Sequence, residues 1–89
     1  MFALEGFTSS LAPATLLAEV QRAWPEAAGR QFAPHSEPVS ERNGVVTVAC
    51  SQSVWANELN LMSELVLTRL NAALGRRAVQ RLRVTATRA

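Results

Sequence analysis

Apolar residues recur every three or four positions early in the chain, and this spacing predicts an amphipathic helix from about Leu11 to Ala23. The apolar face of this helix consists of Leu16, Leu17, Val20, Ala23 and Trp24. Pro25 predicts a boundary or a kink after Trp24, because proline cannot donate the helical hydrogen bond and restricts the residue before it. Gly29 is suited to end a short second piece of helix over residues 25–28.

Between Gly29 and Ser53 the pattern changes to short extended segments, because prolines interrupt any continuous helix there. Asn43-Gly44 predicts a two-residue hairpin turn, since both positions of a type I′ turn need positive φ. The turn joins a strand over Ser36 to Arg42 to a second strand over Val45 to Ser51. Pro38 has no amide donor, so we expect the first strand at an edge of the sheet. One face of the second strand consists of Val46, Val48 and Cys50, and the other of Val45, Thr47 and Ala49.

From Ser53 to Leu74 the apolar positions again step by three or four residues, which predicts the main helix, with Gly75 as its stop. The face that we expect on the sheet consists of Trp55, Leu59, Met62, Val66, Leu70 and Ala73. A second apolar set, on another side of the same helix, consists of Val54, Leu61, Leu65 and Ala72. Either the first helix or a partner protein must cover this second face. We expect the first helix, because so small a domain needs the burial.

Alternation at the end of the chain predicts a half-buried strand over Val79 to Thr87, with Leu82 on the inner side. A strand, a helix and another strand form a crossover that is right-handed and places the last strand parallel to the second. We therefore predict an α+β fold in the order α-(α)-β-β-α-β, with a three-stranded mixed sheet packed on helices. Eighty-nine residues with 48% apolar content suit one domain over residues 1–89, with an ordered core from about 11 to 87.

The basic residues are all arginines, the acidic residues are all glutamates, and the two are unevenly distributed. Up to Glu64 there are seven glutamates and three arginines, whereas the segment from Leu65 to Ala89 has six arginines and no acidic residue. These six are Arg69, Arg76, Arg77, Arg81, Arg83 and Arg88. Clustered positive charge attracts phosphates, so the segment predicts an anionic partner, and the alternative is an ordinary solvated surface.

Few side chains are available for catalysis, because the chain has no Asp, Lys or Tyr. Cys50 shares a strand face with valines and is expected in the core, and His35 has no second metal ligand at a recognised spacing. We therefore predict no enzyme, no metal site, no cofactor and no small-molecule substrate. The lone cysteine and the lack of a signal peptide predict a cytoplasmic protein, and the lack of about 18 consecutive apolar residues predicts no membrane span.

Two motifs with a strand between them carry a resemblance to a known family. The motifs are Trp24-Pro-Glu-Ala-Ala-Gly29 and Ser53-Val-Trp-Ala-Asn-Glu-Leu59, and the strand is Gly44-Val-Val-Thr-Val. In this order they resemble the DciA family of bacterial proteins, and the similarity runs from about Leu16 to Thr85. The motif residues that we expect to hold the fold are Trp24, Gly29, Trp55 and Leu59.

The resemblance implies a KH-like domain that associates with the hexameric replicative helicase of the DnaB type and assists its loading on DNA. It also implies a long, flexible, basic extension in many members, which these 89 residues do not include. KH domains hold nucleotide backbones with a Gly-x-x-Gly loop. The nearest segment here, Gly75-Arg76-Arg77-Ala78, lacks the second glycine. We therefore expect weak, non-specific contact with DNA phosphates and no base recognition.

The leading hypothesis from the sequence is a DNA-replication accessory module that binds the helicase and, weakly, DNA. The residues expected to contact DNA are Arg76, Arg77, Arg81, Arg83 and Arg88. The alternative is a protein-interaction adaptor without a nucleic-acid role, which would use an exposed strand edge or the face of Val54, Leu61 and Leu65.

Overall fold

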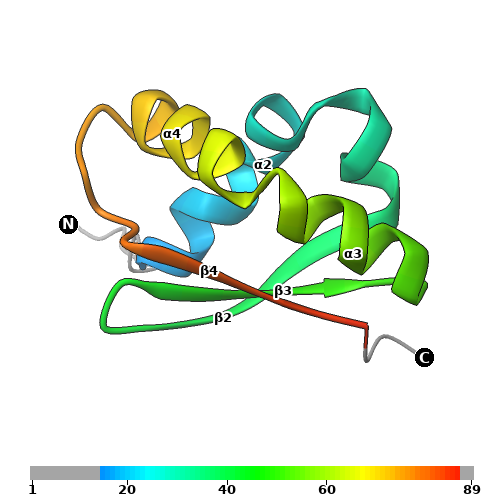
Figure 1. Ribbon diagram of the computed structural model, residues 1–89. Helices are drawn as coiled ribbons and strands as arrows, with labels where there is room; N and C mark the ends of the chain where they lie inside the picture. Colours follow the sequence, from blue (N-terminus) through cyan, green and yellow to red (C-terminus); the bar gives the residue numbers. More distant parts are fainter. Residues whose placement is uncertain (1–14, 87–89) are drawn as a thin grey trace, which may run out of the picture.

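Helices lie over one side of a three-stranded sheet in the computed structural model of the chain, which describes residues 15–86 (Figure 1). In chain order the elements are α2 (Leu16–Phe32), the short 3₁₀ helix η1 (Ala33–His35), β2 (Ser36–Arg42), β3 (Val45–Cys50), α3 (Ser53–Leu61), α4 (Ser63–Leu74) and β4 (Arg81–Thr85). The predicted α+β fold with a mixed sheet is confirmed.

The first described helix, α2, begins after Thr15, whose hydroxyl oxygen accepts a hydrogen bond from the Ala18 amide at 3.0 Å. The expected start at Leu11 lies outside the described residues. The predicted boundary at Pro25 is wrong, because the helix continues through this residue. The apolar face of α2 stays buried on both sides of the proline, and this burial offsets the one helical hydrogen bond that proline cannot make. The helix changes direction instead at Gly29, where φ is 83° and ψ is 170°.

The sheet has the order β2-β3-β4, with β2 antiparallel and β4 parallel to β3, as predicted. Asn43 and Gly44 both have positive φ, of 54° and 84°, as a type I′ turn requires. Strand β2, which contains Pro38, lies at an edge. A bulge between Pro38 and Ser40 leaves Val39 out of register.

The predicted continuous helix from Ser53 to Leu74 is wrong, because the structure divides it into α3 and α4 at Met62, whose φ is −99° and ψ is 8°. The two helices pack on different surfaces: α3 lies against β3 and β4, whereas α4 packs mainly against α2. The bend lets each helix bury a side of its own, Leu59 from α3 and Leu70 from α4.

The expectation that the second apolar set packs against the first helix is also wrong. Val54 is 55% exposed, Leu61 82% and Leu65 44%, and Ala72 is exposed as well. That expectation treated residues 53–74 as one straight cylinder, and the bend at Met62 removes the basis for it.

The core lies between the helices and the inner face of the sheet, and Trp24 is part of it, 3% exposed. The Trp24 indole N–H donates to the Ser36 hydroxyl oxygen at 3.0 Å, and that hydroxyl donates to the Phe32 carbonyl at 2.6 Å. These two hydrogen bonds link α2 to the start of β2 and satisfy the buried polar groups there.

The other fold residues named from the sequence lie in or against the same core. Leu59 is fully buried, and so is Cys50, as predicted. Trp55 is half-buried, packed edge-to-face on Phe32 with ring centroids 6.0 Å apart and stacked on His35 at 4.2 Å. Trp24 and Leu59, one from each motif, belong to the same core, and Trp55 packs against it.

Candidate nucleic-acid interface

One face of the sheet has no helix over it in the part of the chain that the structure describes (Figure 1). Val46 and Leu82 are paired across β3 and β4, and both are buried toward the helices. Because side chains alternate along a strand, their neighbours point to the other side. We call that side the open sheet face.

Three arginines gather on the open sheet face. In the register of the sheet, Arg81 pairs with Val45, which pairs on its other side with Arg42. Arg83 lies one rung further along β4, opposite Thr47. Arg81 and Arg83 are therefore about 6.6 Å apart along the strand, and Arg42 is about 9.6 Å from Arg81 across two strand spacings.

The guanidinium groups of this trio are exposed and unpaired. Neither Arg42, Arg81 nor Arg83 forms an ion pair with another described residue. Arg42 and Arg83 line the same shallow groove, whose floor includes Thr47. Each of the three guanidinium groups is permanently charged and can donate hydrogen bonds to one phosphate of a nucleic-acid backbone.

Sequence reasoning missed Arg42, although the signal was present. A two-residue hairpin loop at Asn43-Gly44 pairs Arg42 with Val45, which lies on the strand face opposite Val46, Val48 and Cys50. Arg42 was instead counted with the acidic first part of the chain.

Arg76 is placed differently from the trio. Its guanidinium donates two hydrogen bonds to the carboxylate of Glu19, at 3.0 and 3.2 Å, and joins the first turn of α2 to the end of α4. The hydrogen bond from Arg76 lowers the pKa of Glu19 below its ordinary 4.5, and the same bond raises the pKa of Arg76. The charge of Arg76 is thus balanced locally.

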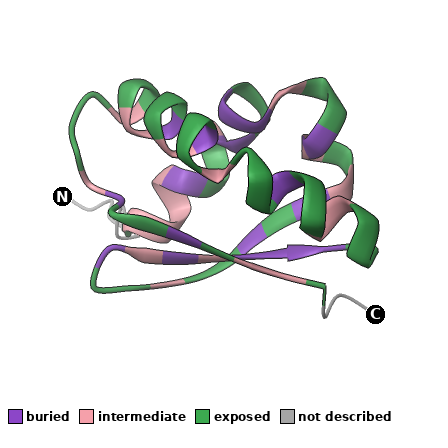
Figure 2. Cartoon of the chain, in the orientation of Figure 1, coloured by how far each residue is buried: buried purple, intermediate pink, exposed green. Residues whose placement is uncertain are grey.

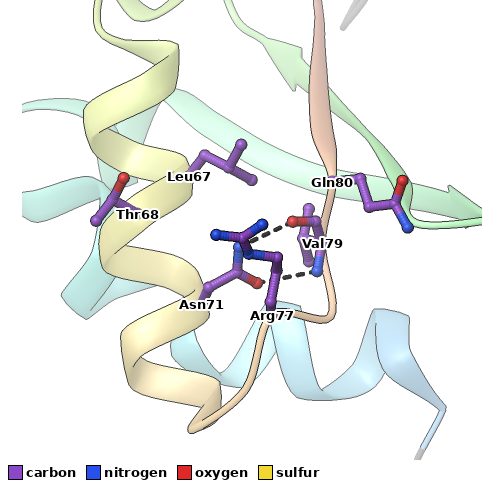
Figure 3. A pocket seen from close by; sticks show the side chains of 6 residues that line it. All are labelled: Leu67, Thr68, Asn71, Arg77, Val79 and Gln80. Atoms are coloured by element: carbon purple, nitrogen blue, oxygen red, sulfur yellow. Dashed lines mark hydrogen bonds between the residues drawn. The ribbon is translucent and has the colours of Figure 1, made fainter.

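Arg77 lies in the connection from α4 to β4, beside a groove lined by Leu67, Thr68, Asn71, Arg77, Val79 and Gln80 (Figure 3). The Asn71 side chain fixes this connection. Its carbonyl oxygen accepts from the Ala78 and Val79 amides, at 3.1 and 2.9 Å, and its amide nitrogen donates to the Val79 carbonyl at 2.8 Å. Arg88 lies outside the described residues.

The Gly75–Ala78 segment that we compared with a Gly-x-x-Gly loop lies between a helix and a strand. Helices α3 and α4 follow one another directly and meet at Met62, without a glycine. Within residues 15–86, a glycine loop that could hold a nucleotide backbone between two helices is therefore absent. Exposed arginines remain as the groups suited to phosphate: Arg77 in the connection to β4, single arginines of the helix layer, and the three that gather on the open sheet face.

Other chemistry has little support in the described residues. Cys50 is inaccessible to substrate, and the His35 ring is stacked on Trp55. Among residues 15–86 there is no group of three or more His, Cys, Asp or Glu side chains suited to a metal ion. None of the helices in this range has the length and apolar character needed to cross a membrane.

These features define a small α+β domain with a basic sheet face that no helix of the described residues covers. The chain belongs to the DciA family, because the family model described as "Dna[CI] antecedent, DciA" matches residues 3–84. The family named from the sequence motifs is thus confirmed.

Relatives of the chain carry the description UPF0232 protein. One from Rhodococcus jostii is 34% identical over 62 residues, which are 70% of this chain and 33% of the relative. One from Mycolicibacterium paratuberculosis is 31% identical over 80 residues, which are 90% of this chain and 42% of the relative. A Mycobacterium leprae protein is 36% identical over 62 residues, 70% of this chain and 33% of its own length. The chain therefore spans about a third to two fifths of these relatives.

Proposed function

We propose that this chain is an accessory module of DNA replication that associates with the DnaB-type replicative helicase, assists its loading, and contacts DNA weakly through the open sheet face. Membership of the DciA family supports the helicase part. The observation that carries the DNA part is the arrangement of Arg42, Arg81 and Arg83 on a face that no described helix covers, each without an ion pair to a residue within 15–86.

The chemistry of the open sheet face favours the DNA backbone over the bases. The groove beside Arg42 and Arg83 is lined by Ser40, Glu41, Asn43, Val45 and Thr47, without an aromatic ring. The Glu41 carboxylate accepts a hydrogen bond from the Gly44 amide at 2.8 Å. Base stacking needs aromatic rings, whereas phosphate contact needs only fixed positive charge. DNA contact through this face is therefore independent of sequence and decreases steeply with salt.

The DNA contact is tested with a triple variant, Arg42→Ser, Arg81→Ser and Arg83→Ser. Each phosphate contact contributes about 0.9 to the slope of log affinity against log salt on duplex DNA and about 0.7 on single strands. The slope should therefore become shallower by roughly 2.7 on duplex and 2.1 on single-stranded DNA. Fluorescence anisotropy with labelled oligonucleotides across a salt series measures both values.

The matched control removes the same charge from the helix layer, by Arg22→Ser, Arg30→Ser and Arg69→Ser. These residues are exposed on α2 and α4. The control should keep most of the wild-type slope. Equal losses in the two triple variants would show that net charge, rather than the open sheet face, determines binding.

The helicase contact is tested by size-exclusion chromatography of the chain with the replicative helicase of its own organism, at micromolar concentration and low salt. A complex that elutes with the helicase is expected. Failure of the two proteins to associate under these conditions would refute the helicase part and leave the DNA part to be judged by the anisotropy data.

A protein-interaction adaptor without a nucleic-acid role is the second candidate. The exposure of Val54, Leu61 and Leu65 favours it, since large exposed apolar side chains that gather on one surface mark protein contacts. Helicase binding together with DNA affinity that the triple sheet variant leaves unchanged would select this candidate.

A further inference from the structure

Exposed apolar side chains concentrate along α3 and at its bend into α4, with Val54 in the first turn of α3 and the others around Met62. Among the described residues, five large apolar side chains are exposed, and four of them lie within twelve positions of one another. These four, which we call the apolar elbow, are Val54, Leu61, Met62 and Leu65. Leu61 is the most exposed, at 82%. The fifth residue, Val39, lies on the bulge of β2.

The fold holds the apolar elbow in place. Leu59 of α3 and Val66 of α4 are buried on the inner side, which turns the opposite sides of both helices outward. The backbone hydrogen bonds from Met62 to Glu58 and from Val66 to Met62 keep the bend ordered, at 3.2 and 3.0 Å. The outer sides of α3 and α4 are largely exposed in Figure 2. The elbow is therefore a preformed surface.

Two carboxylates flank the apolar elbow. Glu58 lies one turn before Leu61, and Glu64 lies next to Leu65, and both are exposed. Neither carboxylate forms an ion pair or a hydrogen bond with another described residue. Glu64 also lines a groove between the elbow and β4, together with Asn60, Ser63 and, from β4, Arg81, although Glu64 and Arg81 form no ion pair with each other. The surface thus has an apolar centre and an acidic rim.

We propose that the apolar elbow is the docking surface for a segment of a partner protein in which apolar side chains are flanked by Lys or Arg. Apolar side chains of the segment would cover Leu61 and Leu65, and its cations would pair with Glu58 and Glu64. Within the proposed function, on which this assignment to a partner rests, the segment belongs to the replicative helicase.

Charge disfavours a second copy of this chain as the occupant. A two-fold dimer through the elbow would bring the same patch of both copies together. Glu58 and Glu64 of one copy would then approach the like charges of the other, which opposes association. A basic partner segment turns the same carboxylates into attractive groups.

Docking at the elbow leaves the DNA contact accessible. The elbow belongs to the helix layer, which lies over one side of the sheet (Figure 1), whereas Arg42 and Arg83 line a groove with Thr47 on the open sheet face. Arg81, on the edge strand β4, also lines the groove that contains Glu64. One domain can therefore hold a protein partner and a nucleic-acid backbone at the same time.

The test compares the wild type with the double variant Leu61→Ser and Leu65→Ser, using Val39→Ser as a matched control on another surface. All three positions are exposed, so the variants should keep the wild-type unfolding temperature. The first probe is a labelled amphipathic peptide of leucine and lysine, with a leucine and glutamate peptide for comparison, and the second probe is the helicase. The double variant should bind the basic peptide and the helicase at least about tenfold more weakly, with unchanged DNA affinity.

A second pair of variants, Glu58→Gln with Glu64→Gln, should remove the preference for the basic peptide over the acidic one. The proposal is overturned if the double leucine variant binds the basic peptide as tightly as the wild type, or if the wild type shows no preference between the peptides. Dimerisation that the leucine variant abolishes would also overturn it. If only helicase binding is missing in the wild type, the proposed function fails, and the peptide results decide on the elbow.

Discussion

The Asn71 side chain holds the connection between α4 and β4 in place, and its replacement tests how much this connection stabilises the domain. The side chain makes three hydrogen bonds to the backbone of Ala78 and Val79, and Val79 is only 1% exposed. Asn71→Ala removes all three partners at once. The Val79 amide and the Val79 carbonyl then lose their protein partner unless the loop moves, whereas the Ala78 amide still donates to the Arg76 carbonyl at 2.9 Å.

The expected loss follows from these bonds. A hydrogen bond contributes about 1 kcal/mol net, so three contribute about 3 kcal/mol when no water replaces them. The groove beside Asn71 is open, so water can solvate part of the freed backbone (Figure 3). We therefore expect Asn71→Ala to lower the free energy of unfolding by about 2 kcal/mol. For a domain of this size, that corresponds to a decrease in Tm of roughly 8–16 °C.

Two further variants make the measurement specific. Asn71→Asp keeps the two accepted hydrogen bonds and loses the donated one, so it should cost about 1 kcal/mol. Thr68→Ala changes another residue of the same groove, but the Thr68 hydroxyl bonds only to the Glu64 carbonyl of its own helix. It should stay within about 0.5 kcal/mol of the wild type. Urea unfolding followed by tryptophan fluorescence gives all three values. An Asn71→Ala variant as stable as Thr68→Ala would refute the reasoning.

Two other predictions concern pH and backbone conformation. The hydrogen bond from Arg76 lowers the pKa of Glu19 in the folded state, so the stability that this pair adds is present above the ordinary pKa of 4.5 and is lost as pH falls through the lower folded value. Urea unfolding should therefore show Glu19→Gln less stable than the wild type near neutral pH, with a difference that disappears in acid; a difference that persists in acid would contradict the pairing. Gly29→Ala should cost about 1–3 kcal/mol, because the φ and ψ of Gly29 lie in a region that side chains exclude. Gly75→Asn, at a left-handed position that Asn tolerates, should cost less, and thermal unfolding of the two variants compares them.

The sheet could be predicted from the sequence because its signals are local or topological. Asn43 and Gly44 set the hairpin turn, and through it the register of β2 against β3. Pro38 marks the edge strand. The helical segment before β4 requires a crossover, and a crossover places β4 parallel to β3. None of these inferences depends on how the helices pack.

The helix layer could be predicted only in part, because its bends depend on packing. Apolar spacing continues through Met62, and no glycine or proline marks the end of α3. The break exists because α3 rests on the sheet and α4 on α2, which is a property of the whole fold. At Pro25 the sequence predicted a helix boundary that the structure does not have. The helix continues there because burial of its apolar face outweighs the local effect of proline.

The arginines show the same division between local and distant effects. Strand alternation placed Arg81 and Arg83 together on the outer side, and the register confirms this position. The pairing of Arg76 with Glu19 joins residues 57 positions apart, and no sequence spacing indicates it. Whether a given arginine is available to a partner is therefore decided by the tertiary structure.

The net charge of the chain is only +2, so general attraction to DNA is weak and the local arrangement of charge must decide any contact. The exposed carboxylates Glu58 and Glu64 in the helix layer repel phosphate, whereas the open sheet face presents Arg42, Arg81 and Arg83 within about 12 Å of one another. Exposed arginines also lie in the helix layer, namely Arg22, Arg30 and Arg69, and Glu37 is exposed on the open sheet face, so the preference of phosphate for the sheet rests on the close spacing of its three arginines. For this reason the variant of Arg22, Arg30 and Arg69 is the decisive control: a loss of DNA affinity equal to that of the sheet variant would show that no face is preferred.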